Sequence, residues 1–97
     1  MLAVRVAISD PNKDSVRKIY LEDHKRHLRS GQLSILQSGP IMNDSGIGEG
    51  GVVVADVGSL EEMRRFSSAD PFVVHGVYRD VVIYEWRPTI GALASAR

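Results

Sequence analysis

The segment HKRHLRSGQLSILQSGP, residues 24–40, decides the fold because it joins the end of an expected helix to an expected strand. The helix is predicted over residues 13–30, and Gly31 can close it because glycine readily adopts the left-handed conformation. The residues that recur at helical spacing on its inner face are Val16, Tyr20, His24, His27 and Leu28. Residues 33–38 are expected to form the following strand, which ends at Gly39 and Pro40.

The sequence on either side of this segment predicts two further strands. In residues 2–8, Leu, Val and Ile alternate with Ala3, Arg5 and Ala7, which is the period-two pattern of a strand. The stretch MNDSGIGEGG, residues 42–51, is rich in turn-forming residues and predicts a loop. Residues 51–57 are apolar on both faces of the strand that follows, so we expect this strand to lie in the middle of the sheet.

The second half of the chain predicts one more helix and one more strand. Ser59 and Glu62 have the spacing of a capping box, which marks a helix start. This helix is expected to end near Asp70, because Pro71 disfavours helical geometry in the residue before it. Residues 78–86 alternate again and predict the last strand.

The order of elements is β-α-β-β-α-β, which indicates an α+β fold in a single domain over residues 1–97. Two helices cover only one face of a four-stranded sheet, yet the strands carry apolar residues on both faces. A second copy of the chain could cover the other face. We therefore expect a homodimer that packs sheet to sheet, with a higher oligomer as a further option.

Composition limits the classes of partner. Twelve Lys and Arg balance twelve Asp and Glu, which argues against nucleic acid as a partner. No apolar run is long enough to cross a membrane, and the first residues do not have the pattern of an export signal. There is no cysteine, so disulfides and thiolate chemistry are excluded, and we expect a cytoplasmic protein.

His24 and Asp70 are the side chains best suited to chemistry. His24 lies on the inner stripe of the first helix, either as a core histidine bonded to a backbone carbonyl or as a general acid or base. Asp70 is either the end of a helix in an Asp-Pro turn or the carboxylate that orients His24. Both helices lie on one face of such a sheet, so the two residues could meet. His27 could share a metal with His24, but no third ligand has a recognisable spacing.

Two further motifs carry less weight. The glycines of residues 46–51 have the composition of a phosphate-binding loop, but they precede a strand instead of leading into a helix, so a nucleotide site is not expected. Ser38 has no basic partner that would mark it as a nucleophile, although it can donate a hydrogen bond from a strand end. His75 is expected at a solvent edge or a dimer contact.

The runs HKRHLRSGQLSILQSGPIMNDSG and SLEEMRRFSSADPFVVHGVYRDVVIYEWRP resemble the YciI-like family, a YCII-related domain of the dimeric α+β barrel superfamily. The matching positions are His24, Leu28, Ser38-Gly39-Pro40 and Ala69-Asp70-Pro71-Phe72. The resemblance extends from about residue 1 to residue 91. It implies a ferredoxin-like protomer with a four-stranded antiparallel sheet, which dimerises into an α+β barrel.

The same resemblance implies site residues. His24 and Asp70 correspond to the catalytic pair of the family, and Ser38, Gly39, Pro40 and Phe72 are implied to bind the substrate. No metal and no organic cofactor are implied. One position departs from the pattern, since family members often have Arg where this chain has Leu21. The ligand is then either less acidic or held by Arg26 or Arg29 instead.

Three functions are compatible with these observations. The first is a cofactor-independent enzyme in which His24 and Asp70 move protons on a small cyclic or aromatic metabolite, as a lyase, isomerase or hydrolase. The second is a non-catalytic small-molecule-binding or accessory protein that uses the same pocket. The third is a cofactor-free oxygenase on the same architecture.

Overall fold

The computed structural model describes residues 1–94. Its elements are, in order, β1 (Leu2–Ser9), the short 3₁₀ helix η1 (Pro11–Lys13), α1 (Asp14–Leu28), β2 (Ser34–Met42), β3 (Gly48–Asp56), α2 (Leu60–Ser68), α3 (Pro71–Val74) and β4 (Tyr78–Trp86). In the described part of the chain, no helix is both long and apolar enough to cross a membrane.

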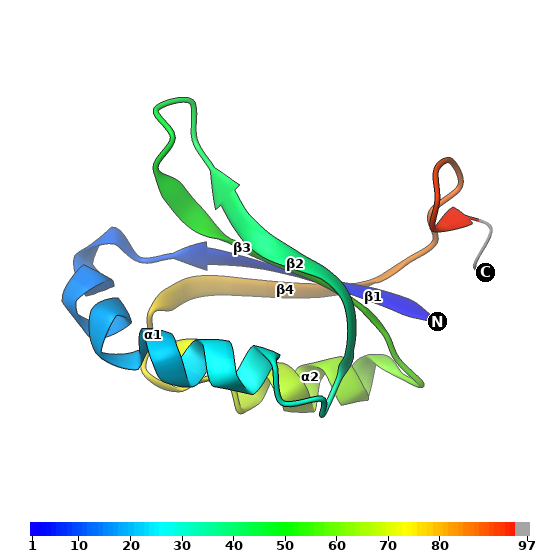
Figure 1. Ribbon diagram of the computed structural model, residues 1–97, viewed down its shortest axis with the longest axis horizontal. Coiled ribbons are helices and arrows are strands. Elements are labelled where there is room, and N and C mark those ends of the chain that lie inside the picture. Colours follow the sequence, from blue (N-terminus) through cyan, green and yellow to red (C-terminus); the bar gives the residue numbers. More distant parts are fainter. Residues whose placement is uncertain (95–97) are drawn as a thin grey trace.

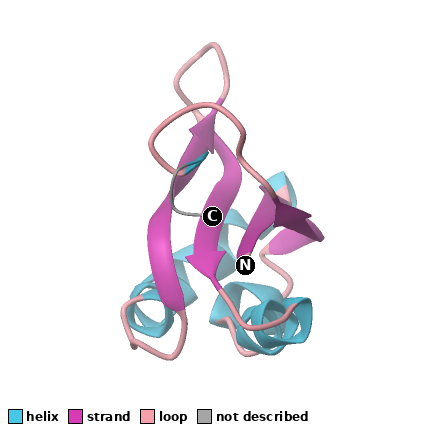
Figure 2. Cartoon of the chain, turned by 90° about the vertical axis from the view of Figure 1, so that its right-hand side faces the viewer, coloured by secondary structure: helices cyan, strands magenta, loops and turns pink. Residues whose placement is uncertain are grey.

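The four strands form one antiparallel sheet in the order β2-β3-β1-β4. Helices α1 and α2 lie side by side on the same face of this sheet, as two perpendicular views show (Figures 1 and 2). This is the ferredoxin-like α+β fold that was expected. The prediction that residues 51–57 form a central strand is also confirmed, since β3 lies between β2 and β1.

The prediction that Gly39 and Pro40 end the second strand is wrong. Strand β2 continues through both residues to Met42, and Pro40 pairs with Gly51 of β3. Proline is tolerated here because β2 is an edge strand, so the N–H that proline lacks is not required by a second neighbour. The hairpin is longer as a result, and β3 begins at Gly48, earlier than expected.

The second helix starts as predicted and ends two residues before Asp70, close to the expected position. The Ser59 hydroxyl accepts the backbone N–H of Glu62 at 3.3 Å, which confirms the N-cap, and α2 ends at Ser68. Asp70 does not end this helix. It is the N-cap of α3, where its Oδ1 accepts the N–H of Phe72 at 2.9 Å. Pro71 favours this start because its fixed φ suits the first helical position.

The core lies between the two helices and the sheet. Its buried cluster consists of Ala3, Leu33, Val53, Ala55, Val57, Met63 and Phe66. On β1 the residues that face the helices are Ala3, Arg5 and Ala7, and each has at most 1% of its surface exposed. A charged side chain is therefore buried between two alanines, whose small size leaves room beneath the helices.

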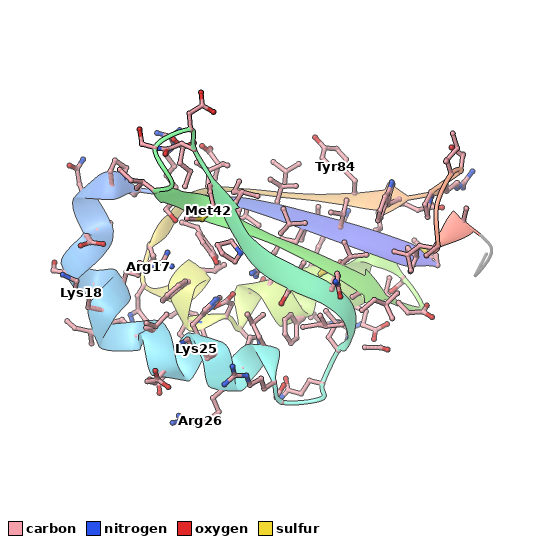
Figure 3. All side chains as sticks on the ribbon, turned by 45° about the horizontal axis from the view of Figure 1, so that its top comes forward. Arg17, Lys18, Lys25, Arg26, Met42 and Tyr84 are labelled. Atoms are coloured by element: carbon pink, nitrogen blue, oxygen red, sulfur yellow. The ribbon has the colours of Figure 1, made fainter. Side chains whose placement is uncertain are left out.

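The opposite face of the sheet is apolar and open. On β4, Val82, Tyr84 and Trp86 are 40%, 58% and 40% exposed. Figure 3 shows Tyr84 projecting from β4 on the side away from the helices. Together these side chains form what we call the open face.

Candidate active site

A cavity of about 270 Å³, called the site cavity below, lies between α1 and the β2–β3 hairpin. Helix α1 contributes Arg17, Leu21, His24, Lys25 and Leu28 to its wall. The hairpin contributes Ser38, Gly39 and Pro40 from β2, and Gly51 and Val53 from β3. Ser38, Gly39 and Pro40 were implied to bind substrate, and the structure places all three at this cavity.

His24 and Asp70 are in direct contact. Their atoms Nδ1 and Oδ1 are 2.7 Å apart, although the two residues are 46 positions apart in the chain. His24 belongs to the inner face of α1 and is 8% exposed, whereas Asp70 is fully buried at the start of α3. The ring of His24 lines the site cavity, and its Nε2 has no hydrogen-bond partner among residues 1–94.

Arg5 is a site residue that was not predicted from the sequence. Its Nη1 donates to Asp70 Oδ2 at 2.9 Å and also to the Ser67 hydroxyl at 3.3 Å. The guanidinium is 1% exposed, and its Nε is buried with no partner among the described residues. The only signal in the sequence was the alternation of residues along the strand, which places Arg5 on the same face as Ala3 and Ala7. Asp70 consequently accepts hydrogen bonds from a histidine, an arginine and a backbone amide.

These contacts determine the ionisation of Asp70. Burial alone would raise its pKa, because a carboxylate loses hydration. The hydrogen bond and the charge of His24, the N–H of Phe72 and the charge of Arg5 outweigh burial and hold the pKa of Asp70 below its ordinary value. Asp70 is therefore ionised at neutral pH and accepts the Nδ1–H of His24. In the neutral ring, Nε2 then carries the free lone pair.

Phe72, which was implied to bind the substrate, is not among the residues that line the site cavity. It is 1% exposed, and its ring stacks on the imidazole of His24 with centroids 3.9 Å apart and planes 4° apart. The N-cap geometry of α3 turns Phe72 inward, behind the histidine. Stacking on Phe72 thus orients the plane of the His24 ring, and the hydrogen bond to Asp70 determines which nitrogen points away from the carboxylate.

Tyr78, the first residue of β4, is a second cavity residue that the sequence analysis did not single out. Its ring lies edge-on to His24, with centroids 6.2 Å apart, and beneath the guanidinium of Arg5 at 5.5 Å. Burial raises the pKa of the Tyr78 hydroxyl, with a further contribution from the charge of Asp70, while Arg5 and Arg17 oppose it. The hydroxyl therefore stays protonated at neutral pH and can donate a hydrogen bond.

The cations at the site cavity differ from those expected. Leu21 lines the cavity, and on the same helix face Arg17 and Lys25 line it too. Arg26 and Arg29 do not. Arg26 forms an exposed pair with Asp23 at 2.9 Å and projects from the far side of α1 (Figure 3). Helical periodicity explains the absence of Arg26, because position 26 does not share a face with Leu21. Arg29 follows Leu28, the last residue of α1, so it does not continue this helix face.

The other two histidines have structural contacts. His27 Nε2 lies 2.8 Å from the carbonyl oxygen of Phe66, to which it donates, and its ring stacks on the Phe66 ring at 4.1 Å. His75 is exposed, as expected for a solvent edge, and stacks on Tyr20 at 3.6 Å. Within residues 1–94, no group of three or more His, Asp and Glu side chains has the arrangement of a metal site.

Solved structures with the same fold are numerous. The chain is similar to 5-chloro-2-hydroxyhydroquinone dehydrochlorinase (TftG) from Burkholderia phenoliruptrix AC1100 in complex with 2,5-dihydroxybenzoquinone, with a TM-score of 0.78, 22% identity, and coverage of 89% of this chain and 93% of that one. It is also similar to an antibiotic biosynthesis monooxygenase (TM-score 0.54, 13% identity, coverage 91% and 100%). A third similar structure is Rv0793 from Mycobacterium tuberculosis, with a TM-score of 0.52, 12% identity, and coverage of 94% of this chain and 96% of that one.

Sequence comparison is more specific than these structural similarities, which establish the fold alone. No curated protein sequence matches the chain significantly. The family model of the YCII-related domain matches residues 1–87, which is most of the chain. The chain therefore belongs to the YCII-related domain family.

Proposed function

We propose that this protein is a cofactor-independent enzyme that catalyses proton transfer on a small cyclic or aromatic metabolite. The observation that carries the proposal is the 2.7 Å contact between His24 Nδ1 and the buried Asp70, with the His24 ring at the wall of the site cavity. A carboxylate that orients a histidine in this way is a recurrent arrangement for general acid–base catalysis.

In the proposed reaction, Nε2 of His24 takes a proton from a carbon or a hydroxyl group of the ligand. The electron pair left behind moves into the ring and either expels a leaving group or rearranges a double bond. Asp70 stabilises the imidazolium that forms, and the proton is later returned to the product or to water. Tyr78, whose hydroxyl remains protonated, donates a hydrogen bond to the oxygen on which negative charge develops.

The size of the cavity supports a ligand with one ring. An apolar protein cavity of about 150 Å³ is large enough for benzene. The site cavity, at about 270 Å³, therefore has room for one ring with several substituents. The similar dehydrochlorinase was solved with a benzoquinone derivative, which is a ligand of this size class.

We also propose that the chain is a homodimer through the open face. Val82, Tyr84 and Trp86 are each at least 40% exposed on one strand, which is a large apolar area for a monomer to leave in water. Tyr84→Lys places a charge in the centre of this surface. Light scattering should give twice the chain mass for the wild type and the single mass for the variant. A wild type that is monomeric at all concentrations contradicts the assembly.

The function is tested by a screen of hydroxylated and halogenated monocyclic compounds, followed by absorbance and by halide release. His24→Gln should lower turnover of any substrate found by about 10²–10⁴-fold, which is the usual contribution of a general base. His75→Gln is the matched control, because that histidine is exposed and lies outside the site cavity. Equal turnover in wild type and His24→Gln contradicts the proposal.

Other outcomes of the screen identify the two remaining functions. Compounds that bind tightly but are never converted indicate an accessory binding protein. Oxygen consumption that accompanies substrate loss indicates an oxygenase.

A further inference from the structure

The charge of the site cavity indicates the class of ligand. Three cationic side chains line it, namely Arg5, Arg17 and Lys25, and no Asp or Glu among residues 1–94 does so. A concave surface with one sign of charge attracts ligands of the opposite sign. The net charge of the whole chain is zero, so this excess of positive charge is a local property of the cavity.

The three cations differ in whether their charge is already neutralised. Arg5 is bound to Asp70 at 2.9 Å, and Lys25 Nζ lies 3.7 Å from a Glu22 carboxylate oxygen. The guanidinium of Arg17 makes no ion pair and no hydrogen bond with any described residue. It is half-buried, so its donors are partly removed from water without a protein acceptor in return.

Arg17 nevertheless has one specific contact inside the protein. Its guanidinium carbon lies 5.2 Å from the centroid of the Phe72 ring, a cation–π contact, and His24 stacks on the same ring at 3.9 Å. Arg17 and His24 both line the site cavity, so one small ligand in this cavity can contact the guanidinium and the imidazole. Figure 3 shows Arg17 on the side of α1 that faces the sheet.

We propose that Arg17 binds an oxyanion of the ligand, so that the substrate is a small planar anion, a monocyclic carboxylate or an ionised ring hydroxyl. This inference rests on the proposed function, for which it names the substrate class. The planar guanidinium offers paired donors that match the two oxygens of a carboxylate. The oxyanion at Arg17 positions the ring of the ligand beside Nε2 of His24.

The test uses benzoate and benzamide as probes, because they have nearly the same shape and differ in charge. Binding to the wild-type protein is measured at neutral pH and low salt by calorimetry or by NMR shifts. Benzoate should bind at least about 10-fold more tightly than benzamide, as expected for a charged hydrogen bond. 2,5-Dihydroxybenzoquinone, which carries acidic hydroxyls, is measured alongside, and whichever anion binds more tightly distinguishes the two kinds of oxyanion.

Variants locate the effect on one side chain. Arg17→Gln should weaken benzoate binding about 10- to 100-fold and leave benzamide binding unchanged. Arg17→Lys keeps the charge and should recover part of the affinity. Arg26→Gln removes an arginine from the same helix outside the cavity, so it should bind benzoate like the wild type.

Two results overturn the inference. One is a wild type that binds benzoate no better than benzamide, a measurement that requires no variant to fold. The other is equal loss of benzoate binding in Arg17→Gln and Arg26→Gln. The proposed function can fail separately from this inference. If the anion binds more tightly through Arg17 but no compound is converted, the binding role of Arg17 is retained and only catalysis is excluded. Turnover of an uncharged ring compound that does not depend on Arg17 retains the proposed catalysis and removes the binding role of Arg17.

Discussion

Replacing Asp70 with Asn removes one buried charge while it preserves the shape of the side chain. Asn is as good an N-cap as Asp, so α3 keeps its first hydrogen bond to Phe72. The amide oxygen can also still accept the Nδ1–H of His24. The main change is that Arg5, which is 1% exposed, loses its counter-charge at 2.9 Å.

The magnitude follows from that burial. Breaking a buried ion pair by removing one partner costs about 3–5 kcal/mol, because the remaining charge has neither water nor a counter-ion. The free energy of unfolding of a small domain is about 5–15 kcal/mol in total, so Asp70→Asn should remove a large part of the stability. Arg5→Met combined with Asp70→Asn leaves neither charge and should be more stable than Asp70→Asn alone.

Urea unfolding at one fixed protein concentration measures this cycle. With a slope of about 1–3 kcal/mol per molar urea, Asp70→Asn should lower the midpoint by at least about 1 M. Asp23→Asn is the matched control, because Asp23 and Arg26 are also 2.9 Å apart but are exposed. An exposed pair contributes about 0–1 kcal/mol, so the control should shift the midpoint little.

Two results refute this reasoning. One is an Asp70→Asn variant that is destabilised no more than Asp23→Asn. The other is a double variant whose loss equals the sum of the two single losses, since Arg5 and Asp70 would then be energetically independent despite their contact.

Three further predictions concern the same region. Because the folded pKa of Asp70 lies below the unfolded value of about 3.9, its contribution to stability is complete above that value; urea midpoints should lose it as pH falls through the lower, folded pKa, and Asp70→Asn should lack this component. Tyr78→Phe should lower kcat about 10²-fold or more with little change in ligand affinity, as measured by initial rates and calorimetry; unchanged kcat excludes the proposed hydrogen bond. Gly50→Ala would place Cβ against the carbonyl oxygen of Ala7 and should lower Tm strongly, whereas at Gly39 a Cβ meets nothing within 4 Å, so Gly39→Ala should not lower Tm; equal Tm values by circular dichroism contradict this packing.

Much of the fold could be predicted because hydrophobic periodicity is a local signal. The alternation in residues 2–8 and 78–86 predicted β1 and β4, and the capping box at Ser59 located the start of α2. The strand boundaries around Pro40 were wrong because tolerance of proline depends on which strand lies at the sheet edge. Which strand lies at the edge depends on how the whole sheet assembles, so no short segment of sequence predicts it.

The candidate site was predictable only in part for a related reason. His24 was accessible to prediction because its place on the inner face of α1 follows from helical spacing. A charged residue in an alternating strand, such as Arg5, ordinarily indicates the solvent side. It is buried here because the face it shares with Ala3 and Ala7 is the one that the helices cover, and its charge is tolerated only because Asp70 reaches it.

The position of Asp70 links the fold and the proposed chemistry. One carboxylate caps α3, neutralises Arg5 and accepts the Nδ1–H of His24, so a substitution at Asp70 perturbs stability and the His24 ring together. A loss of activity in Asp70→Asn alone would therefore not identify the orienting role. Arg5→Met removes the buried cation that makes the asparagine costly. If Asp70→Asn lowers activity in the Arg5→Met background while the folded fraction stays constant, the loss belongs to the charge of Asp70 beside His24, because the buried cation and the unfolding it would cause are both absent.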